Sequence, residues 1–292
     1  MPYPRLPRFT RRPPKRPITL TDRDREIIQL VHRHRFLRSI HLPGLIGGST
    51  QQLLRRLQFL YHSGYLERPR AQIDYYTKGG SRPIVYGLGN KAASLLTSEN
   101  QIPRYKRRWG ERNRSAGRVF LEHALLVSDV LVSIEMACQR SAVARFLSED
   151  DLQRQIPGFT SFRWQVKIKG GLKLGVVPDR VFALELGPPS STDRAYFFLE
   201  ADRGTMPITR KKLAQTSFFR KLLAYEATWK QSIHTARFGF HRFRVFTVTK
   251  SEVRLFGIKT AAASLEHGRG LFVFSTEERL SSPTEVLKTL LN

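Results

Sequence analysis

Apolar residues recur at helical spacing in three consecutive segments near the start of the chain. The first segment follows Thr21, which can cap a helix together with Asp24 at its third position. The second covers roughly residues 37–45 and ends at a pair of glycines. The third follows Ser49, another capping residue, and places leucines at i, i+4 and i+7. These segments predict three helices in succession.

Two short apolar segments, near residues 64–67 and 83–88, come next and flank a polar stretch with a second glycine pair. They predict two strands joined by a loop, and a short helix over 90–96 closes the segment. Three helices followed by a hairpin are typical of a winged helix-turn-helix. Residues 18–98 are therefore predicted to form a winged-helix domain.

Helical and strand patterns alternate in the remainder of the chain, which favours a mixed α/β domain over residues 118–292. The expected elements are a helix over 119–140, a strand after it, strands near 162–168, 176–186 and 196–202, a helix over 208–231 and a strand over 243–249, then a helix, a strand over 271–275 and a C-terminal helix. Residues 99–117 are polar and basic and are interpreted as a linker.

The charge of the chain points to a polyanionic partner. The formal net charge is +26, and residues 1–118 carry 25 Lys and Arg against 7 Asp and Glu. Residues 1–17 are rich in proline and arginine and predict a disordered basic arm. This arm either lies along DNA phosphates or serves as a solubilising tail.

The third predicted helix has a face without carboxylates, which is suited to the major groove of double-stranded DNA. That face carries Gln51, Gln52, Arg55, Arg56, Gln58 and His62. A solvated face is the other interpretation, although such faces usually include Asp or Glu. Arg70, Lys78 and Arg82 lie in and around the hairpin loop, where a wing would reach the DNA backbone. Winged helices commonly bind as dimers, so a homodimer is a further expectation.

Acidic residues lie at the ends of two predicted strands of the second domain. Asp179 follows Pro178, and Glu200 and Asp202 share one face of the later strand. If the strands are neighbours the carboxylates converge, and two such charges at ~5 Å repel by about 3 kcal/mol at an effective dielectric of 20. A bound Mg²⁺ or Mn²⁺ relieves that repulsion. The other interpretation is ion pairing, of Asp179 with Arg180 or Arg210 and of Asp202 with Arg203.

The order of helix, strands, Pro-Asp, strand and Glu resembles the PD-(D/E)XK nuclease fold. More closely, the segments EHALLVSDV, VPDRVFAL, FFLEADRGT and KLLAY together resemble the replication-relaxation family of bacterial and plasmid-borne proteins. The resemblance covers roughly residues 20–250. It implies a winged helix followed by a nuclease-like domain, a role in replication or mobilisation of a plasmid or other mobile element, and replication or mobilisation proteins as partners.

The resemblance also assigns residues to a catalytic site. Asp179 corresponds to the aspartate of the motif and Glu200 to its second acid, both as metal ligands. Asp202 stands where the nuclease pattern has lysine, which adds a metal ligand but removes a cation. Lys221, with Tyr225 one turn later, or Lys212 is expected to supply the missing cation. The other interpretation is that these lysines are solvated or contact phosphate.

Glu122, on the first helix of the second domain, is a further expected metal ligand. A surface ion pair is its other interpretation.

Two functions remain open at this point. One is a DNA endonuclease or nickase that requires Mg²⁺ or Mn²⁺, and the other is a DNA-binding regulator with a degenerate nuclease domain. The single cysteine, Cys138, excludes an intrachain disulfide. No membrane-spanning run and no signal-peptide core occurs in the sequence, so a cytoplasmic protein without membrane contact is expected.

Overall fold

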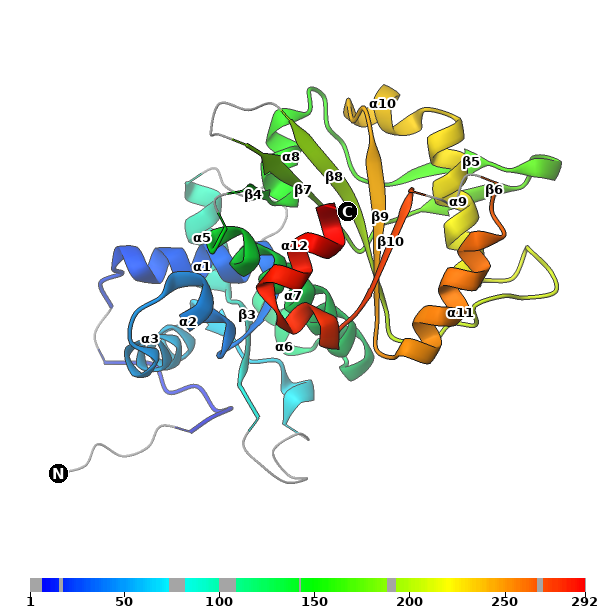
Figure 1. Cartoon of the computed structure of the whole chain (residues 1–292). Coiled ribbons are helices and arrows are strands. Elements are labelled where there is room, and N and C mark those ends of the chain that lie inside the picture. The colour runs from blue at the N-terminus through cyan, green and yellow to red at the C-terminus, as the bar shows by residue number, and fades with distance from the viewer. Residues whose placement is uncertain are drawn as a thin grey trace. The chain divides into compact units, whose positions relative to one another are not determined.

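The computed structural model describes residues 7–15, 18–73, 82–99, 109–141, 143–187, 193–266 and 270–291. The chain divides into two compact units, Met1–Val132 and Ser133–Asn292. Each unit has its own sheet (Figure 1).

The first unit combines helices with a small antiparallel sheet. Its elements are α1 (Asp22–His34), β1 (Phe36–Arg38), α2 (His41–Ile46), α3 (Thr50–His62), β2 (Leu66–Glu67), the 3-10 helix η1 (Arg70–Gln72), β3 (Val85–Leu88), α5 (Asn90–Ser98), α6 (Trp109–Arg114) and the start of α7 (Arg118–Gln139). The strand order is β1-β3-β2. As predicted, three helices precede the two strands of the hairpin.

The helix cap predicted at Thr21 is present in this unit. The Thr21 hydroxyl accepts from the backbone N–H of Asp24, and the Asp24 carboxylate accepts from that of Thr21, so α1 begins with a capping box. The predicted second helix begins later than expected, at His41. Residues 36–38 form β1 instead, because they pair with Val85–Gly87 of β3.

The boundary between the units lies inside α7, beyond the predicted linker of residues 99–117. Leu121, Ala124 and Leu125 of α7 pack with Phe36 of β1 and Val85 of β3 in one buried cluster. The first half of α7 therefore belongs to the unit that precedes it. Composition alone could not show this, because it does not reveal which core an apolar helix completes.

The second unit is built on a five-stranded mixed sheet with the order β10-β9-β8-β7-β4. The strands are β4 (Ala144–Leu147), β7 (Arg180–Leu186), β8 (Arg194–Asp202), β9 (Phe243–Thr249) and β10 (Phe272–Thr276). β7 runs antiparallel to both of its neighbours, β4 and β8, whereas β8, β9 and β10 run parallel. The remaining elements are α8 (Glu149–Gln155), β5 (Trp164–Lys167), η3 (Lys169–Gly171), β6 (Lys173–Val176), α9 (Phe218–Lys230), α10 (Ile233–Phe238), α11 (Glu252–Ala263), η4 (Glu278–Ser281) and α12 (Pro283–Leu291).

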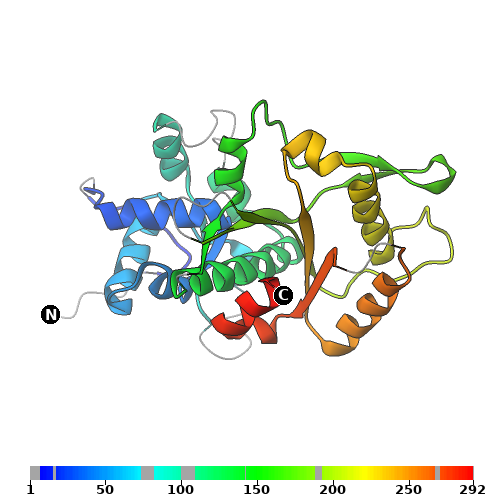
Figure 2. The same ribbon diagram turned by 45° about the horizontal axis from the view of Figure 1, so that its top comes forward.

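One face of this sheet is covered by α9, α11 and the β5–β6 hairpin, as Figure 2 shows. Val181 of β7, Phe198 of β8 and Val245 of β9 are buried in the same apolar cluster as Leu222 of α9 and Ile258 of α11. Since alternate residues of a strand share a face, Glu200 and Asp202 lie on the face of Phe198. Their side chains are thus directed towards the covering helices.

Two predicted elements are shorter than the sequence indicated. The strand expected over 176–186 begins only at Arg180, as β7, because residues 177–179, which include Pro178, separate it from β6. The helix expected over 208–231 begins only at Phe218, where Ser217 caps it. Residues 209–216 are exposed and include Arg210, Lys211 and Lys212.

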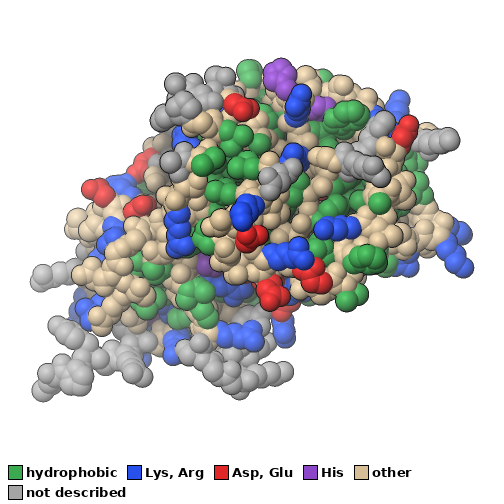
Figure 3. Space-filling view, viewed as in Figure 1, with side chains coloured by type: hydrophobic (Ala, Val, Ile, Leu, Met, Phe, Trp, Pro, Cys, Tyr) green, Lys and Arg blue, Asp and Glu red, His purple; other side chains and the backbone are tan. Residues whose placement is uncertain are grey.

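No helix in the described ranges combines the length and the apolar character that a bilayer span requires. Lys and Arg side chains are exposed over much of the face drawn in Figure 3. This distribution fits the net charge of +26.

Candidate functional site

Asp179 is held beside Glu200 by the pairing of β7 and β8. The Asp179 backbone N–H donates to the Leu199 carbonyl at 3.0 Å, and the Asp179 Oδ2 accepts from the backbone N–H of Ala201 at 2.8 Å. Two hydrogen bonds therefore fix Asp179 to the residues on both sides of Glu200. The expected approach of these two carboxylates on neighbouring strands is present in the structure.

Glu200 is buried, with 2% of its surface exposed, and two residues of α9 contact its carboxylate. The Lys221 ammonium lies 2.5 Å from Glu200 Oε2, and the Tyr225 hydroxyl donates to Oε1 at 2.6 Å. Lys221 and Tyr225 are one helical turn apart, so both can reach the same carboxylate. Of the two lysines predicted as replacement cations, the structure brings Lys221 to the acids.

The charges of this cluster act on one another. Burial raises the pKa of Glu200, with a further contribution from Asp179, while Lys221 and Tyr225 oppose the rise. Burial lowers the pKa of the Lys221 ammonium, but Glu200 and Asp179 outweigh this effect and raise it above its usual value. Burial and the charge of Glu200 raise the pKa of Tyr225 well above its ordinary value. Lys221 is thus a cation and Tyr225 a neutral donor at neutral pH.

Asp202, which the sequence predicts as a metal ligand, forms an ion pair with Arg254 of α11. The guanidinium contacts both carboxylate oxygens, at 2.7 and 3.0 Å, and the Thr249 hydroxyl donates to Oδ2 at 3.1 Å. Arg254 lies 52 positions after Asp202, whereas the ion pair considered from the sequence was with Arg203. Within the described ranges, no group of three or more His, Cys, Asp or Glu is placed to hold a metal ion.

Among the described residues, Lys212 forms no hydrogen bond or ion pair with the cluster around Glu200, and Glu122 lies on the part of α7 that belongs to the first unit. Glu122 accepts a hydrogen bond from Arg118 one turn earlier on α7, at 2.9 Å, which is the surface ion pair that the sequence left open. Lys212 is exposed in the stretch that precedes α9. The acidic cluster therefore consists of Asp179, Glu200 and Lys221, with Tyr225 as a hydrogen-bond donor.

Some of the residues predicted to contact DNA lie on the exposed face of α3 in the first unit. Gln51, Gln52 and Arg55 are exposed, and Gln58 is half-buried. Leu53, Leu57 and Leu60 are buried on the opposite side of the helix, as their spacing predicts. The four polar side chains remain candidates for groove contact.

Arg56 has a structural partner that the sequence did not indicate. Its guanidinium forms an ion pair with Asp24, a fully buried carboxylate of α1, with Nε donating to Oδ1 at 2.8 Å. The charge of Arg56 compensates a buried charge, so the prediction that Arg56 contacts DNA is corrected. An ion pair between residues on different helices leaves no signal in local spacing.

His62 is likewise buried rather than directed outwards, with 2% of its surface exposed. Its Nδ1 accepts from the backbone N–H of Arg12 at 3.0 Å. Burial, together with nearby Arg68 and Arg11, lowers the pKa of His62 to about 4. The predicted role of His62 as a DNA contact is corrected to one of holding residues 7–15.

The stretch 7–15 differs from the disordered arm that its composition predicts. The Arg11 guanidinium donates to the carbonyls of Tyr61 and Leu66 at 2.9 and 3.0 Å, and to Glu67 Oε1 at 2.9 Å. These contacts fasten the segment to the end of α3 and to β2. Arg11 is a residue whose role the sequence alone did not reveal.

The neutral state of His62 predicts acid sensitivity. The pKa of His62 is about 4 in the folded chain, below the ordinary value of 6.5, so the unfolded chain binds more protons between these pH values. We expect the protonation of His62 to have little effect on the free energy of unfolding above pH 6.5. As the pH falls towards 4, it should lower that free energy by about 2–3 kcal/mol. Urea denaturation at a series of pH values measures the effect.

The matched control is His62→Asn, which keeps an acceptor for Arg12 but does not titrate. Its stability is expected to change less over the same pH range. Equal slopes for the two proteins would contradict the assignment.

The predicted wing is described only at its edges. Arg70 and Arg82 are exposed. Lys78 lies outside the described residues.

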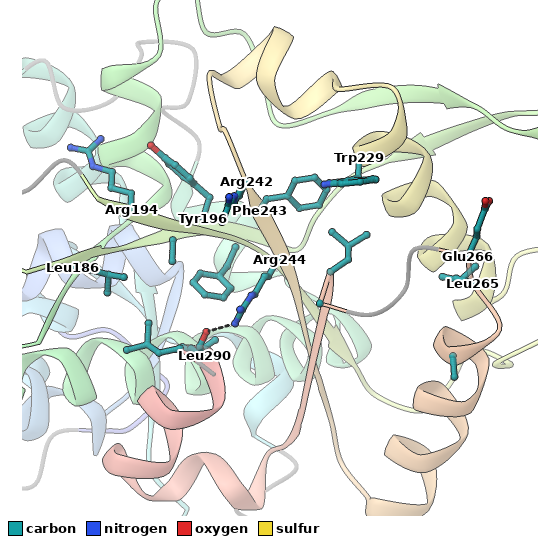
Figure 4. Close-up of a pocket in the computed structure, with 16 residues that line it drawn as sticks. Leu186, Arg194, Tyr196, Trp229, Arg242, Phe243, Arg244, Leu265, Glu266 and Leu290 are labelled. Atoms are coloured by element: carbon teal, nitrogen blue, oxygen red, sulfur yellow. Dashed lines mark hydrogen bonds between the residues drawn. The ribbon is translucent and has the colours of Figure 1, made fainter.

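A hollow of about 740 Å³ lies at the other end of β8 from Glu200 (Figure 4). Arg194, Tyr196, Trp229, Arg242 and Arg244 contribute to its lining, whereas the acidic cluster does not. Sequence reasoning did not identify this hollow.

Comparison with known proteins gives one family match. A family model described as replication-relaxation matches residues 28–242. The comparison with curated proteins gives no significant match. Among solved structures, the restriction endonuclease FokI is similar at a TM-score of 0.27 and 9% identity, over 94% of this chain and 46% of that chain. A likeness this weak supports neither a fold nor an activity.

Proposed function

The chain belongs to the replication-relaxation family, and from this premise we propose that it binds double-stranded DNA and cleaves a DNA strand with the help of Mg²⁺ or Mn²⁺. Binding is assigned to the first unit and cleavage to the cluster around Glu200. The reaction would serve replication or mobilisation of a plasmid or other mobile element.

One observation carries the proposal for cleavage. Lys221 contacts Glu200 at 2.5 Å, while Asp179 is tied to the adjoining backbone of β8 at 2.8 Å. Two carboxylates and one ammonium thus meet at paired strands, as in the nuclease pattern, with the lysine supplied from α9 instead of β8. The order of strands β4, β7 and β8, then α9 and the parallel strand β9, supports the same nuclease-like reading of the second unit.

The donor set fits a hard divalent cation. A carboxylate has about four lone-pair sites, so Glu200 can accept from Lys221 and Tyr225 and still bind a metal. Mg²⁺ commonly uses one or two protein carboxylates and completes its shell with water and phosphate. Asp179 and Glu200 would hold the ion, which would polarise the phosphate and activate water. Lys221, with 37% of its side chain exposed, can orient that water or stabilise charge on phosphate oxygens.

The first unit supports DNA binding through its element order and its charge. We assign the first unit to the winged-helix class, because three helices precede β2 and β3, and the strands are arranged β1-β3-β2. We assign groove contact to Gln51, Gln52, Arg55 and Gln58 of α3, and backbone contact to Arg70 and Arg82.

Residues 7–15 extend this proposed interface. Arg11 and the backbone of Arg12 fasten the segment, while the side chains of Arg12 and Lys15 are exposed. We assign them to DNA phosphates beside α3.

Plasmid cleavage tests the proposal directly. The protein is incubated with supercoiled plasmid and Mg²⁺ or Mn²⁺, and Asp179→Ala is compared with the unaltered chain. Nicking or linearisation by the unaltered chain, lost in Asp179→Ala, is expected. Absence of cleavage, or equal cleavage by both proteins, would overturn the catalytic assignment.

A second candidate function is a non-catalytic DNA-binding regulator. The observation in its favour is that Arg254 neutralises Asp202 and that Lys221 already pairs with Glu200. Under this alternative both ion pairs serve the packing of α9 and α11 on the sheet. DNA binding would then persist without cleavage.

Binding to duplex DNA is expected to fall steeply with salt. About six phosphate contacts would reduce affinity by about 10³-fold between 50 and 200 mM salt, because counterions released on binding compete at higher salt. Fluorescence anisotropy with a labelled duplex measures the slope. Arg12→Ala is expected to reduce that slope by about one ion, whereas a slope near zero for the unaltered chain would reject the electrostatic assignment.

A further inference from the structure

The hollow at the start of β8 and β9 is separate from the acidic cluster. Arg194 and Glu200 are six residues apart on one strand, about 20 Å at roughly 3.3 Å per residue. The volume of about 740 Å³ falls within the range of small-molecule sites, roughly 300–1,000 Å³. A ligand here would not compete with groups bound at Glu200.

Apolar side chains form much of the lining of the hollow. Phe197, Phe243, Leu271 and Leu290 line it, and each is itself buried in the core. Trp229, at the end of α9, also lines the hollow and is 45% exposed. An exposed indole beside an apolar surface offers a planar face on which an aromatic ring can stack.

Three arginines give the hollow a positive charge. Arg244 donates to the Leu290 carbonyl at 3.1 Å, which leaves most of its donors available (Figure 4). Arg194 is partly compensated by Glu185 at 3.0 Å. Arg242 is exposed and has no hydrogen bond or ion pair among the described residues.

The lining contains little negative charge to offset these arginines. Glu266 is the carboxylate of the described lining, and it accepts from Lys230 at 2.7 Å. The guanidinium fork matches the oxygens of a phosphate, which it can bind through two hydrogen bonds. The unmet charge of the hollow therefore favours a phosphate-bearing ligand.

We propose that this hollow binds a nucleotide, with the base stacked on Trp229 and the phosphate held by Arg242. A phosphate alone would leave the aromatic surface unused, and an uncharged aromatic molecule would leave the arginines without a partner. The nucleotide can be free in solution or part of a single DNA strand, because both present the same base and phosphate. The inference does not depend on DNA cleavage at Glu200.

Tryptophan fluorescence provides the test, carried out on the full chain in EDTA so that metal-dependent reactions do not contribute. The probes are dAMP, deoxyadenosine, inorganic phosphate, and a short oligo(dA) as a single strand or paired with oligo(dT). We expect saturable quenching by dAMP, with at least tenfold weaker binding of deoxyadenosine and of phosphate. Tighter binding of the single strand than of dAMP would identify a strand as the source, and binding of dAMP alone a free nucleotide.

Three variants connect the signal to the hollow. Arg242→Ala is expected to weaken dAMP binding at least tenfold, because it removes a charge-assisted hydrogen bond. Trp229→Phe is expected to lose the quenching but to retain dAMP binding in equilibrium dialysis, since a phenyl ring still stacks. Arg163→Ala removes the same charge from an exposed site outside the lining and is expected to bind as the unaltered chain does.

The proposal fails if no nucleotide or strand binds. It also fails if Arg242→Ala and Arg163→Ala bind dAMP equally. A hollow that takes a protein segment instead would give the first of these results.

Discussion

Lys221→Ala is expected to lower the rate of metal-dependent plasmid nicking by at least about a hundredfold, whereas Lys212→Ala is expected to stay within about twofold of the unaltered chain. Both changes remove one lysine from the same part of the sequence. Lys221 lies 2.5 Å from Glu200, but Lys212 is exposed before α9 begins. The comparison therefore separates a positioned cation from general attraction to DNA.

The measurement is the initial rate of conversion of supercoiled to nicked plasmid in Mg²⁺ or Mn²⁺. Because Lys221→Ala leaves Tyr225 as the remaining hydrogen-bond donor to the buried Glu200 carboxylate, circular dichroism and thermal unfolding must first show that the variant is folded. Duplex affinity is measured in parallel and is expected to change little in either variant. Equal loss in both variants, or a larger loss in Lys212→Ala, would remove Lys221 from the reaction.

The pairing of Asp179 with Glu200 could be predicted because it depends on local rules. Alternation along a strand and the short sequence distance between β7 and β8 brought the two acids to neighbouring positions. The ion pair of Asp202 could not be predicted, because its position next to Arg254 depends on the pairing of β8 with β9 and on the packing of α11. A contact formed across 52 residues is decided by topology, not by spacing.

In the first unit, too, elements set by local sequence were predicted, whereas those that depend on tertiary contacts were not. Capping residues and leucine spacing correctly indicated α1 and α3, whose determinants are local. Strand β1 was missed because residues 36–38 are extended only through pairing with β3. The outward face of α3 was partly misassigned, since helical spacing identifies the buried leucines but not the polar residues that other elements cover. Arg56 and His62 are the two residues affected.

Arg56→Ala is expected to lower the free energy of unfolding by about 2–3 kcal/mol, because it leaves the fully buried Asp24 carboxylate without its cation. The ion pair with Arg56 lowers the pKa of Asp24 against the opposing effect of burial, which is the largest contribution. Arg55→Ala is the matched control, one position earlier and exposed. It is expected to change stability by less than about 0.5 kcal/mol.

DNA affinity is expected to respond in the opposite order. Arg55→Ala should weaken duplex binding by about tenfold, since it removes a groove or phosphate contact, while folded Arg56→Ala should bind nearly as well as the unaltered chain. Urea denaturation measures stability, and anisotropy below the unfolding range measures affinity. Arg56→Ala could instead be as stable as the unaltered chain and lose as much DNA affinity as Arg55→Ala. That result would show that Arg56 contacts DNA and that its ion pair with Asp24 does not stabilise the fold.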